Sequence, residues 1–550
     1  MVAAGPLPLP LLVTVFALFQ TVTSEQHHGG ADIWVFMTIG YSSHNNFFRP
    51  LVLELAERGH RVTFFTTVRS NKHGAGNRTS TPMGGYVQEI VFEEGAKLTA
   101  IMGKDQWSWK GNILRRDQTS AKERFVNVTR DACESLFQWE EFLPYFQGHK
   151  GRPDLVINTM FFQECVLIVP HKFQVPFIMI SPHGLFVGPY SDAIGLRPFY
   201  STVQHPILSF PSNMTFLQRV GNLLALLSLE SFSRSLMSDF VDGFLTQHNQ
   251  GESLTLIEIL RECSLYILNW DIATEPPIAS IAPVIHAGGL HCRPAKPIPK
   301  NLQDWIEKGQ KGFIYFSLGS AAKGIFMGEE ERRMFVEAFK QFPDYRIFWK
   351  WETEKMEDLP PHVFLSKWFP QQDLLGHDDI RLFITHGGLL STQEATYHGV
   401  PVVGIGIGVD QMANMQNTER KGAGIALEWA SLSTEGIVEA MNRILRDPSF
   451  RENVARRSVL MKDQPEGPLE KAAFWVEFVI RHGGAKHLRS AARDLNWWQY
   501  HSFDVWGFLI TCFCTVALLN FWFFRWCLRS LLSRRWKGNS RLARQKLKKT

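Results

Sequence analysis

The chain has 550 residues, of which 45% are hydrophobic and 20% are charged, and its formal net charge is +5. This length predicts two main domains rather than a single core, with the composition of an ordinary globular chain. The positive charge is concentrated at one end, because every charged side chain after Phe524 is Lys or Arg. The rest of the chain is therefore mildly acidic, which argues against a nucleic-acid partner.

Two segments at the chain ends indicate targeting to a membrane. An apolar run over 7–19, followed by small residues at 22–24, predicts a secretory signal peptide over 1–24. Near the other end, residues 505–524 carry no charge, which suits a bilayer core about 30 Å thick. We therefore expect a membrane-proximal segment over 481–502, a transmembrane helix over 503–524 and a basic cytosolic tail over 525–550.

These segments predict a single-pass type I membrane protein with its domains in a lumen. Lys546 and Lys548 resemble a retrieval signal to the endoplasmic reticulum. A lumenal chain could be glycosylated at three Asn-x-Thr sequons, which begin at Asn77, Asn127 and Asn213. The cysteines outside the span form no CxxC pair, which predicts no metal site and leaves one or two disulfides open. They are Cys133, Cys165, Cys263 and Cys292.

The first predicted elements alternate between strand and helix. A buried strand over 33–37 enters a loop over 40–44, and a helix over 45–58, with Pro50 in its first turn, leads to a strand over 61–65. This βαβ unit opens a doubly wound sheet, whose ligands lie at the carboxyl ends of its strands. Residues 70–150 are less regular, and apolar helices within 185–255 could line an acceptor pocket or rest on a membrane. Further strands are expected over 154–157, 175–180 and 265–269, and residues 284–289 close the first domain.

A proline-rich segment over 293–302 divides the chain and is typical of a stiff linker. After it, the pattern of strand and helix resumes, with a buried strand within 312–320. A helix over 329–342, a strand over 346–350 and a helix over 434–446 follow. We therefore expect an α/β fold of two Rossmann-like domains, 25–292 and 303–480, that face each other across a cleft.

Residues 368–424 carry the chemistry of a nucleotide-sugar site. A short strand ends at His386-Gly387-Gly388 before a helix over 391–397, so backbone N–H groups and a positive dipole end can hold phosphate. His386 could donate to a phosphate oxygen, and Glu394 could accept from both hydroxyls of a ribose. Trp368 offers a ring for stacking on a base, and Asp410-Gln411 could bind sugar hydroxyls.

This stretch resembles the UDP-glycosyltransferase family, in particular its UDP-glucuronosyltransferase branch. Trp-x-Pro-Gln, Leu-Leu-x-His, Thr-His-x-Gly, Ser-x-x-Glu, Gly-Val-Pro and Asp-Gln-x-x-Asn occur in the family's order. The resemblance implies a GT-B fold and an N-terminal acceptor-binding domain. It also implies a UDP-sugar site formed by Gly319, Ser320, Lys350, Trp368, Gln371, His386, Gly387, Gly388, Ser391, Glu394, Asp410 and Gln411.

Three positions depart from the family pattern near that site. Leu390 replaces a frequent Asn, which implies the loss of one hydrogen bond to the diphosphate. Gly406 replaces a frequent Pro, and Lys350 stands where relatives often have Arg. None of these changes removes a charge, so donor binding is still expected.

The resemblance also assigns a catalytic base. His44 matches the family's catalytic His, and an imidazole with a pKa near 6.5 can take the acceptor's proton at neutral pH. The position of its usual acidic partner holds Thr159, and Glu164 is the alternative. This departure leaves two hypotheses open, an inverting transferase or a catalytically silent protein that binds UDP-sugar or a lipophile.

The expected partners follow from the first hypothesis. The donor is UDP-glucose or UDP-glucuronic acid, between which the sequence does not decide, and the acceptor is a small lipophilic molecule bearing a hydroxyl. No cofactor and no metal are expected, because neither a DxD motif nor a His/Cys cluster occurs near the site. A homo-oligomer is an open alternative to a monomer.

Overall fold

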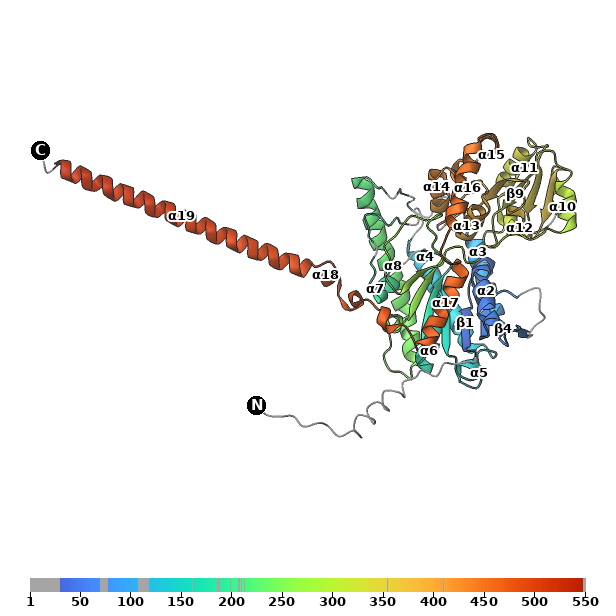
Figure 1. The fold of residues 1–550 in the computed structure, drawn as a ribbon, viewed down its shortest axis with the longest axis horizontal. Helices are drawn as coiled ribbons and strands as arrows, with labels where there is room; N and C mark the ends of the chain where they lie inside the picture. Colours follow the sequence, from blue (N-terminus) through green and yellow to red (C-terminus); the bar gives the residue numbers. More distant parts are fainter. Residues whose placement is uncertain are drawn as a thin grey trace, which may run out of the picture. The chain divides into compact units, whose positions relative to one another are not determined.

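The computed structural model describes residues 30–547, except 70–77, 107–117, 161, 185–187, 198, 206–207, 209, 212, 354 and 409. The predicted signal peptide over 1–24 and the sequon at Asn77 lie outside these residues. The chain divides into two compact units, Met1–Arg489 and Ser490–Thr550. The first unit contains two separate sheets (Figure 1).

The first sheet has eight strands in the order β3-β4-β2-β1-β5-β6-β7-β8, and β3 is its one antiparallel edge strand among the described residues. Its central strands are buried on both faces, as expected of a parallel sheet covered by helices. The strands are β1 (Asp32–Met37), β2 (Arg61–Thr66), β3 (Arg78–Ser80), β4 (Tyr86–Val91), β5 (Leu155–Thr159), β6 (Phe177–Ser181), β7 (Leu265–Leu268) and β8 (Val284–His286).

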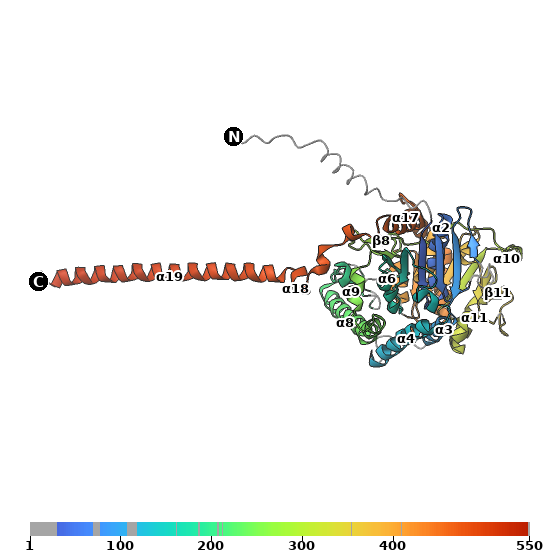
Figure 2. The same ribbon diagram turned by 90° about the horizontal axis from the view of Figure 1, so that it is seen from below.

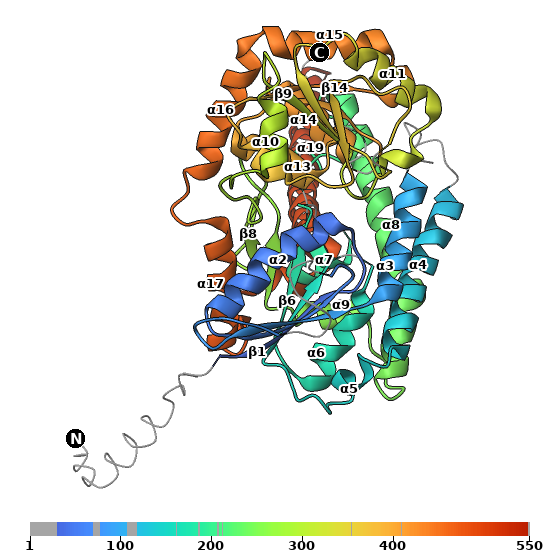
Figure 3. The ribbon, with the colours of Figure 1, turned by 90° about the vertical axis from the view of Figure 1, so that its right-hand side faces the viewer.

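Helices cover both faces of this sheet (Figures 2 and 3). One face packs on α2 (Ser42–Glu57) and on α17 (Pro468–Arg481), which returns from beyond the second sheet although its residues fall in the range predicted for the second domain. The other face packs on residues of α4, η3, α6, α8 and α9. The remaining helices are α3 (Glu93–Gln106), α4 (Gln118–Gln138), α5 (Leu143–Phe146), η3 (Glu164–Leu167), α6 (Ile168–Phe173), α7 (Pro189–Ile194), α8 (Phe216–His248) and α9 (Leu256–Arg261).

The second sheet has six parallel strands in the order β11-β10-β9-β12-β13-β14. They are β9 (Phe313–Ser317), β10 (Arg346–Lys350), β11 (Val363–Ser366), β12 (Ile380–Thr385), β13 (Val402–Ile405) and β14 (Gly424–Leu427). Two apolar cores lie on its opposite faces, one against α11 and α15 and the other against α10, α12 and α13. The helices are α10 (Lys300–Ile306), η4 (Gly324–Phe326), α11 (Glu329–Phe339), α12 (Gln371–Leu375), α13 (Leu389–His398), α14 (Gln411–Arg420), η5 (Trp429–Ser431), α15 (Thr434–Arg446) and α16 (Pro448–Lys462).

The predicted α/β class with two doubly wound sheets is confirmed, and two local predictions are wrong. Helix α2 begins at Ser42 rather than Asn45, so His44 lies in its first turn and not in a loop. Pro50 consequently lies inside α2 rather than in its first turn. The predicted domain boundaries remain predictions.

The second unit begins with short turns and ends in one long helix. Its elements are η7 (Ala491–Asp494), α18 (Trp497–Tyr500) and α19 (Phe503–Leu547), and η6 (Lys486–Leu488) precedes it. Residues Phe503–Ser533 of α19 form a segment with a mean hydropathy of 1.9, long and apolar enough to cross a membrane. The predicted transmembrane segment 503–524 lies within it.

Candidate functional site

A cavity of about 440 Å³ is lined by residues from the segments around both sheets. This volume lies within the usual range for small-ligand sites. Of the twelve residues predicted to bind UDP-sugar, all except Gly387 line the cavity, and His44 lines it from the other side. The sequence therefore brings the predicted donor residues and the predicted base to one cavity.

His386 occupies a cradle made by two glycines. It follows β12, and a Cβ added to Gly319 would stand 2.5 Å from its Cε1, while one added to Gly388 would stand 2.6 Å from its Nε2. Gly319 also has a φ of 77°, which L side chains rarely adopt. Burial, together with nearby Lys350, lowers the pKa of His386 to about 4. At neutral pH this imidazole is therefore uncharged and offers an N–H donor.

The start of α13 supplies further donors to the same place. Gly388 is its N-cap residue and has no side-chain cap, so the first backbone N–H groups of the helix have no capping side chain there. Ser320 adds a buried hydroxyl that has no hydrogen-bond partner among the described residues. These neutral donors and the helix dipole form an environment suited to an anion such as a phosphate.

Glu394 belongs to a hydrogen-bonded chain that runs along the cavity wall. Tyr315 Oη donates to Gln371 Oε1 at 3.2 Å, and Gln371 Nε2 donates to Glu394 Oε2 at 2.6 Å and to Ser391 Oγ at 3.1 Å. Burial raises the pKa of Glu394 to about 7, although the bond from Gln371 acts against this shift. The carboxyl therefore faces the cavity in a fixed orientation, and its charge changes with pH near neutrality.

Trp368 also lines the cavity, but its side chain is 59% exposed, unlike the buried Glu394. Elsewhere in the second domain Asn414 Nδ2 donates to Asp410 Oδ2 at 2.8 Å and to the carbonyl of Gly387 at 3.0 Å. Gln411 Oε1 accepts from the backbone N–H of Ile407 at 3.0 Å. The Asp-Gln-x-x-Asn motif thus ties the Asp410 loop to the His386 turn, and the sequence analysis missed this role of Asn414.

Two of the three departures from the family pattern, Gly406 and Leu390, have visible structural consequences. A Cβ at Gly406 would stand 2.6 Å from the backbone N of Met412, so this loop has no space for a larger residue such as Pro. Leu390 lines the cavity and packs against the core of the first sheet, and its carbonyl lies 3.3 Å from His291 Nε2. Leu390 therefore contributes an apolar contact between the two halves of the unit.

His44 is buried against two aromatic rings. Its ring meets Tyr41 edge to face at a centroid distance of 5.6 Å and His183 at 5.2 Å. Gly40 lies so close that a Cβ there would stand 2.9 Å from His44 Nδ1. Burial lowers the pKa of His44 well below its ordinary value, and His183 lowers it further. The imidazole is therefore neutral at physiological pH, in the form that can accept a proton.

The two residues considered as its partner lie away from the cavity lining. Thr159 ends β5 fully buried, and Glu164 lies in η3, where Tyr190 Oη donates to its carboxylate. Neither is among the residues that line the cavity. Burial raises the pKa of Glu164. A second imidazole, that of His183, contacts His44 instead.

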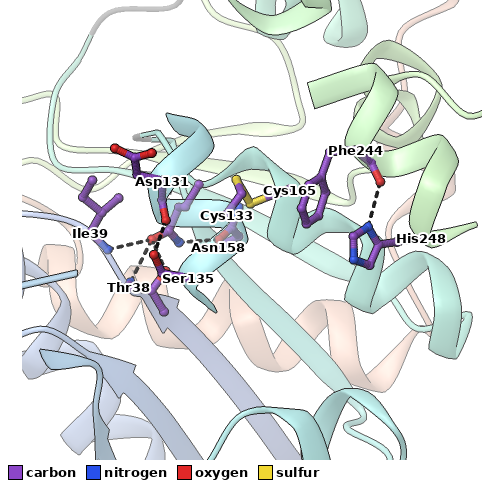
Figure 4. The surroundings of a disulfide bond; sticks show 10 residues. Thr38, Ile39, Asp131, Cys133, Ser135, Asn158, Cys165, Phe244 and His248 are labelled. Carbon is purple, nitrogen blue, oxygen red and sulfur yellow. Dashed lines mark hydrogen bonds between the residues drawn. A yellow bond between two sulfur atoms is a disulfide. The ribbon is translucent and has the colours of Figure 1, made fainter. Parts of the chain in front are cut away.

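A buried glutamine fixes the loop that leads to His44. Gln163 Oε1 accepts from the N–H groups of Thr38 at 2.8 Å and Ile39 at 3.2 Å, and its Nε2 donates to Asn158 Oδ1 at 2.6 Å. Two residues further on, Cys165 forms a disulfide with Cys133 of α4 (Figure 4). This bridge is one of the two that the cysteine count left open. The hydrogen bonds of Gln163 and the nearby disulfide together hold the carboxyl end of β1 in place.

Residues of the first domain that the sequence analysis did not name complete the cavity. His183 follows β6 at its carboxyl end, where a ligand-contacting residue is expected in a doubly wound sheet. The others include the apolar or aromatic side chains of Met102, Met160, Phe162 and Tyr190 and small polar ones such as Ser181. No local motif marks these positions, because they become neighbours only when the sheet and α7 assemble.

Two α/β sheets with a shared cavity between them have the architecture of the GT-B fold. Solved structures agree with this fold. The glycotransferase of kitacinnamycin matches with a TM-score of 0.54 and 17% identity, covering 82% of this chain and 99% of its own. The spinosyn forosaminyltransferase SpnP matches with a TM-score of 0.52 and 17% identity, covering 82% and 99%.

The chain belongs to the family described as "UDP-glucoronosyl and UDP-glucosyl transferase", whose model matches residues 35–538. It is 32% identical to UDP-glucuronosyltransferase 2B7 of Homo sapiens over 86% of this chain and 88% of the relative. It is 33% identical to UDP-glycosyltransferase UGT5 of Dactylopius coccus over 89% and 90%. The predicted family is therefore confirmed, and the chain is a UDP-glycosyltransferase enzyme.

Proposed function

We propose that this enzyme transfers a hexose or glucuronic acid from its UDP-sugar to a hydroxyl group of a small lipophilic acceptor. The observation that carries the proposal is the division of the cavity. One wall presents His386, Glu394 and Asp410, while the first-domain lining around His44 includes the apolar or aromatic side chains of Met102, Met160 and Phe162 among smaller polar ones. A polar donor and an apolar acceptor would therefore meet beside one buried imidazole.

In the proposed reaction the acceptor oxygen attacks the anomeric carbon of the sugar while the bond from that carbon to the β-phosphate oxygen breaks. His44 takes the hydroxyl proton, and UDP leaves with the electron pair of the broken bond. The N–H of His386 and the first amides of α13 would stabilise the charge that develops on the diphosphate. A single displacement without a covalent sugar intermediate inverts the anomeric configuration.

His183 supports the base in this proposal, in place of an acid at Thr159. Its ring contacts that of His44 at 5.2 Å, and it lines the same cavity as Asp410, whose charge acts on it. A neutral second imidazole would fix the orientation of His44 without trapping a proton on it. The two domains would then be coupled through the pair His183 and Asp410.

A donor and acceptor screen tests the reaction. The full chain in microsomes, supplied with UDP-glucose or UDP-glucuronic acid and a panel of phenols and steroids, is expected to form a glycoside of inverted configuration. Chelation by EDTA is expected to leave the rate unchanged, since the proposal assigns no step to a metal. Binding of UDP-sugar without turnover across the whole panel would contradict the proposal and favour a silent binding protein.

Trp368→Ala is expected to weaken UDP binding by about 1–2 kcal/mol, because stacking of a base on an aromatic ring has this order of magnitude. The ring is 59% exposed, so its removal leaves the fold intact. Calorimetry with UDP measures the change, and Trp368→Phe, which keeps a stacking face, is the matched control. If the alanine variant and the wild type bound UDP with equal affinity, the nucleobase of UDP would not stack on Trp368.

We also propose that the two sheets lie in the lumen of the endoplasmic reticulum, anchored by α19. Two of the predicted glycosylation sites support this, because Asn127 and Asn213 are exposed on the described surface. Endoglycosidase H is expected to increase the gel mobility of the chain from microsomes. Asn127→Gln and Asn213→Gln should each remove part of the shift, and a wild type without any shift would argue against the lumenal placement.

A further inference from the structure

His291 lies just before the predicted linker, and the proposed reaction gives it no role. Its side chain is 1% exposed, and its ring packs edge to face on Phe47 of α2 at a centroid distance of 6.2 Å. Burial lowers the pKa of His291 to about 4. At neutral pH the buried imidazole is therefore uncharged and carries a single N–H.

The surroundings of the ring decide which of its nitrogens carries that proton. Nε2 faces two oxygens of the second domain, the carbonyl of Leu390 at 3.3 Å and Glu394 Oε1 at 3.8 Å. Nδ1 is buried and has no hydrogen-bond partner among the described residues. A proton on Nδ1 would leave a buried N–H without an acceptor, which is costly, so the proton belongs on Nε2. Leu390 and Glu394 are four residues apart in α13, so one face of this helix presents both oxygens to the ring.

Each carboxyl oxygen of Glu394 therefore meets one donor. Oε2 accepts from Gln371 Nε2 at 2.6 Å, and Oε1 faces the N–H of His291. An ionised carboxylate accepts at two positions on each oxygen, so one position on each remains for a ligand. Two adjacent ribose hydroxyls match that pair. The distance of 3.8 Å is longer than a hydrogen bond, and the negative charge of the ionised form would draw the N–H closer.

The backbone around His291 is attached to the helix that carries Gln371. The carbonyl of His291 accepts from Gln372 Nε2 at 3.0 Å, and the N–H of Arg293 donates to Gln372 Oε1 at 2.9 Å. Gln371 and Gln372 are the first two residues of α12. Both donors to Glu394 are therefore positioned by the same short helix, one directly and the other through the backbone of the linker.

We propose that His291 is a positioning residue of the donor site, whose Nε2–H stabilises the ionised form of Glu394 and directs its carboxylate toward the ribose of the UDP-sugar. This inference rests on the proposed function, in which Glu394 takes part in donor binding. His291 lies outside the stretch 368–424 and is not among the residues that line the cavity. Donor binding would thus depend on the junction between the two domains.

The other titratable and charged groups near Glu394 keep a constant charge around neutral pH. Arg293 acts on the carboxyl and lowers its pKa, and its guanidinium stays charged. Burial, and next the charge of Glu394, raises the pKa of Cys292. Burial raises the pKa of Tyr315, and Glu394 again adds to the shift. The thiol and the phenol therefore stay protonated while Glu394 titrates.

The test measures the affinity of the full chain in detergent for UDP-glucose and for UDP-glucuronic acid by calorimetry from pH 5.5 to 8.5. Their diphosphates are esterified at both ends and do not titrate in this range. In His291→Leu, the rise of affinity with pH should move upward by about one unit, the size of one hydrogen bond to a charged group. Affinity at pH 7 should then fall about fivefold and nearly recover at pH 8.5. At pH 7 the KM for the donor should rise while kcat at saturating donor stays the same.

Two amide variants keep the test independent of one substitution. His291→Gln places an N–H near the position of Nε2 and should stay within about twofold of the wild type at every pH. His291→Asn is equally polar, but its shorter amide does not reach Glu394, so it should follow His291→Leu. His398→Leu is the matched control, because this imidazole lies in the last turn of the same helix and outside the cavity. Burial lowers the pKa of His398 to about 4 as well, and the pH profile should not change.

A double variant separates a positioning role from a structural one. In the Glu394→Gln background, His291→Leu should have no further effect, because the carboxylate through which His291 acts is absent. A loss of affinity that is equal at every pH, or that recurs in this background, would overturn the proposal. If Glu394→Gln weakened binding while His291→Leu matched the wild type, the positioning role alone would be wrong. If Glu394→Gln bound both donors like the wild type, the donor site itself would be wrong, and this inference with it.

Discussion

Replacing His44 by alanine is expected to lower kcat by about 10²–10⁴-fold, the contribution usual for a positioned general base. The affinity for UDP should stay unchanged, because the predicted donor residues follow strands of the other sheet. Initial rates at saturating donor and acceptor measure the first effect, and calorimetry with UDP measures the second. This division between turnover and binding distinguishes a lost base from a damaged fold.

His149→Ala is the matched control, because this imidazole is exposed and lies outside the cavity. It should keep both the rate and the affinity of the wild type. Wild-type turnover in His44→Ala with any accepted substrate would refute the base assignment. A loss of UDP binding together with turnover would instead show that the substitution disturbs the cavity as a whole.

The pH dependence of kcat provides a second test of His44. Burial and His183 hold the pKa of His44 well below 6.5, so the free imidazole persists at mildly acid pH. At saturating substrate, kcat should therefore remain level as the pH falls from 7.5 to 6. His183→Gln, which removes the neighbouring titratable ring, should move the acid limb of that profile, whereas a purely structural role would change the rate at every pH alike.

Local sequence signals predicted the parts of this site that follow directly from strand ends. His386 comes after β12, and the glycines at 387 and 388 precede α13, so one short stretch contains strand, turn and helix start. The periodicity of such a stretch is visible without any tertiary contact. The residues around His386 were therefore predictable from local signals. Other donor positions, such as Gly319, Ser320 and Lys350, were predictable only from the resemblance to the family, and the roles of all these residues stay predictions.

The acceptor half depends on contacts between distant segments. His183 reaches His44 only because β6 and β1 are separated by a single strand in the first sheet. Gln163 holds Thr38 across 125 residues of sequence, which no local pattern encodes. The start of α2 was placed too late because no capping side chain marks it; Tyr41 is its N-cap and makes no side-chain cap bond. Long-range pairing, and not composition, determines this half.

Replacing Glu394 by glutamine is expected to weaken UDP binding by about 2–3 kcal/mol, because hydrogen bonds to an ionised acceptor contribute this much. The pKa of about 7 sets the pH dependence of the wild type. If the ribose hydroxyls bind the carboxylate, UDP affinity should rise with pH up to about 7 and level off above it. The glutamine variant should lack that slope, which calorimetry at a series of pH values would show.

The same substitution is expected to stabilise the unliganded enzyme above pH 7. A carboxyl whose folded pKa exceeds its ordinary value of 4.5 contributes stability fully below pH 4.5 and loses it as the pH rises through about 7. Glutamine does not titrate and avoids this loss, which a shift of this size limits to roughly 3 kcal/mol.

In thermal denaturation at pH 8 without UDP, Glu394→Gln should therefore melt higher than the wild type, and the difference should shrink toward pH 4.5. Glu439→Gln, on the exposed side of α15, should show neither effect. A variant that binds UDP as tightly as the wild type would remove Glu394 from the donor site. A variant that melts lower at pH 8 would mean that contacts within the fold stabilise the buried carboxylate of Glu394. The carboxylate would then have a structural role that does not depend on the ribose.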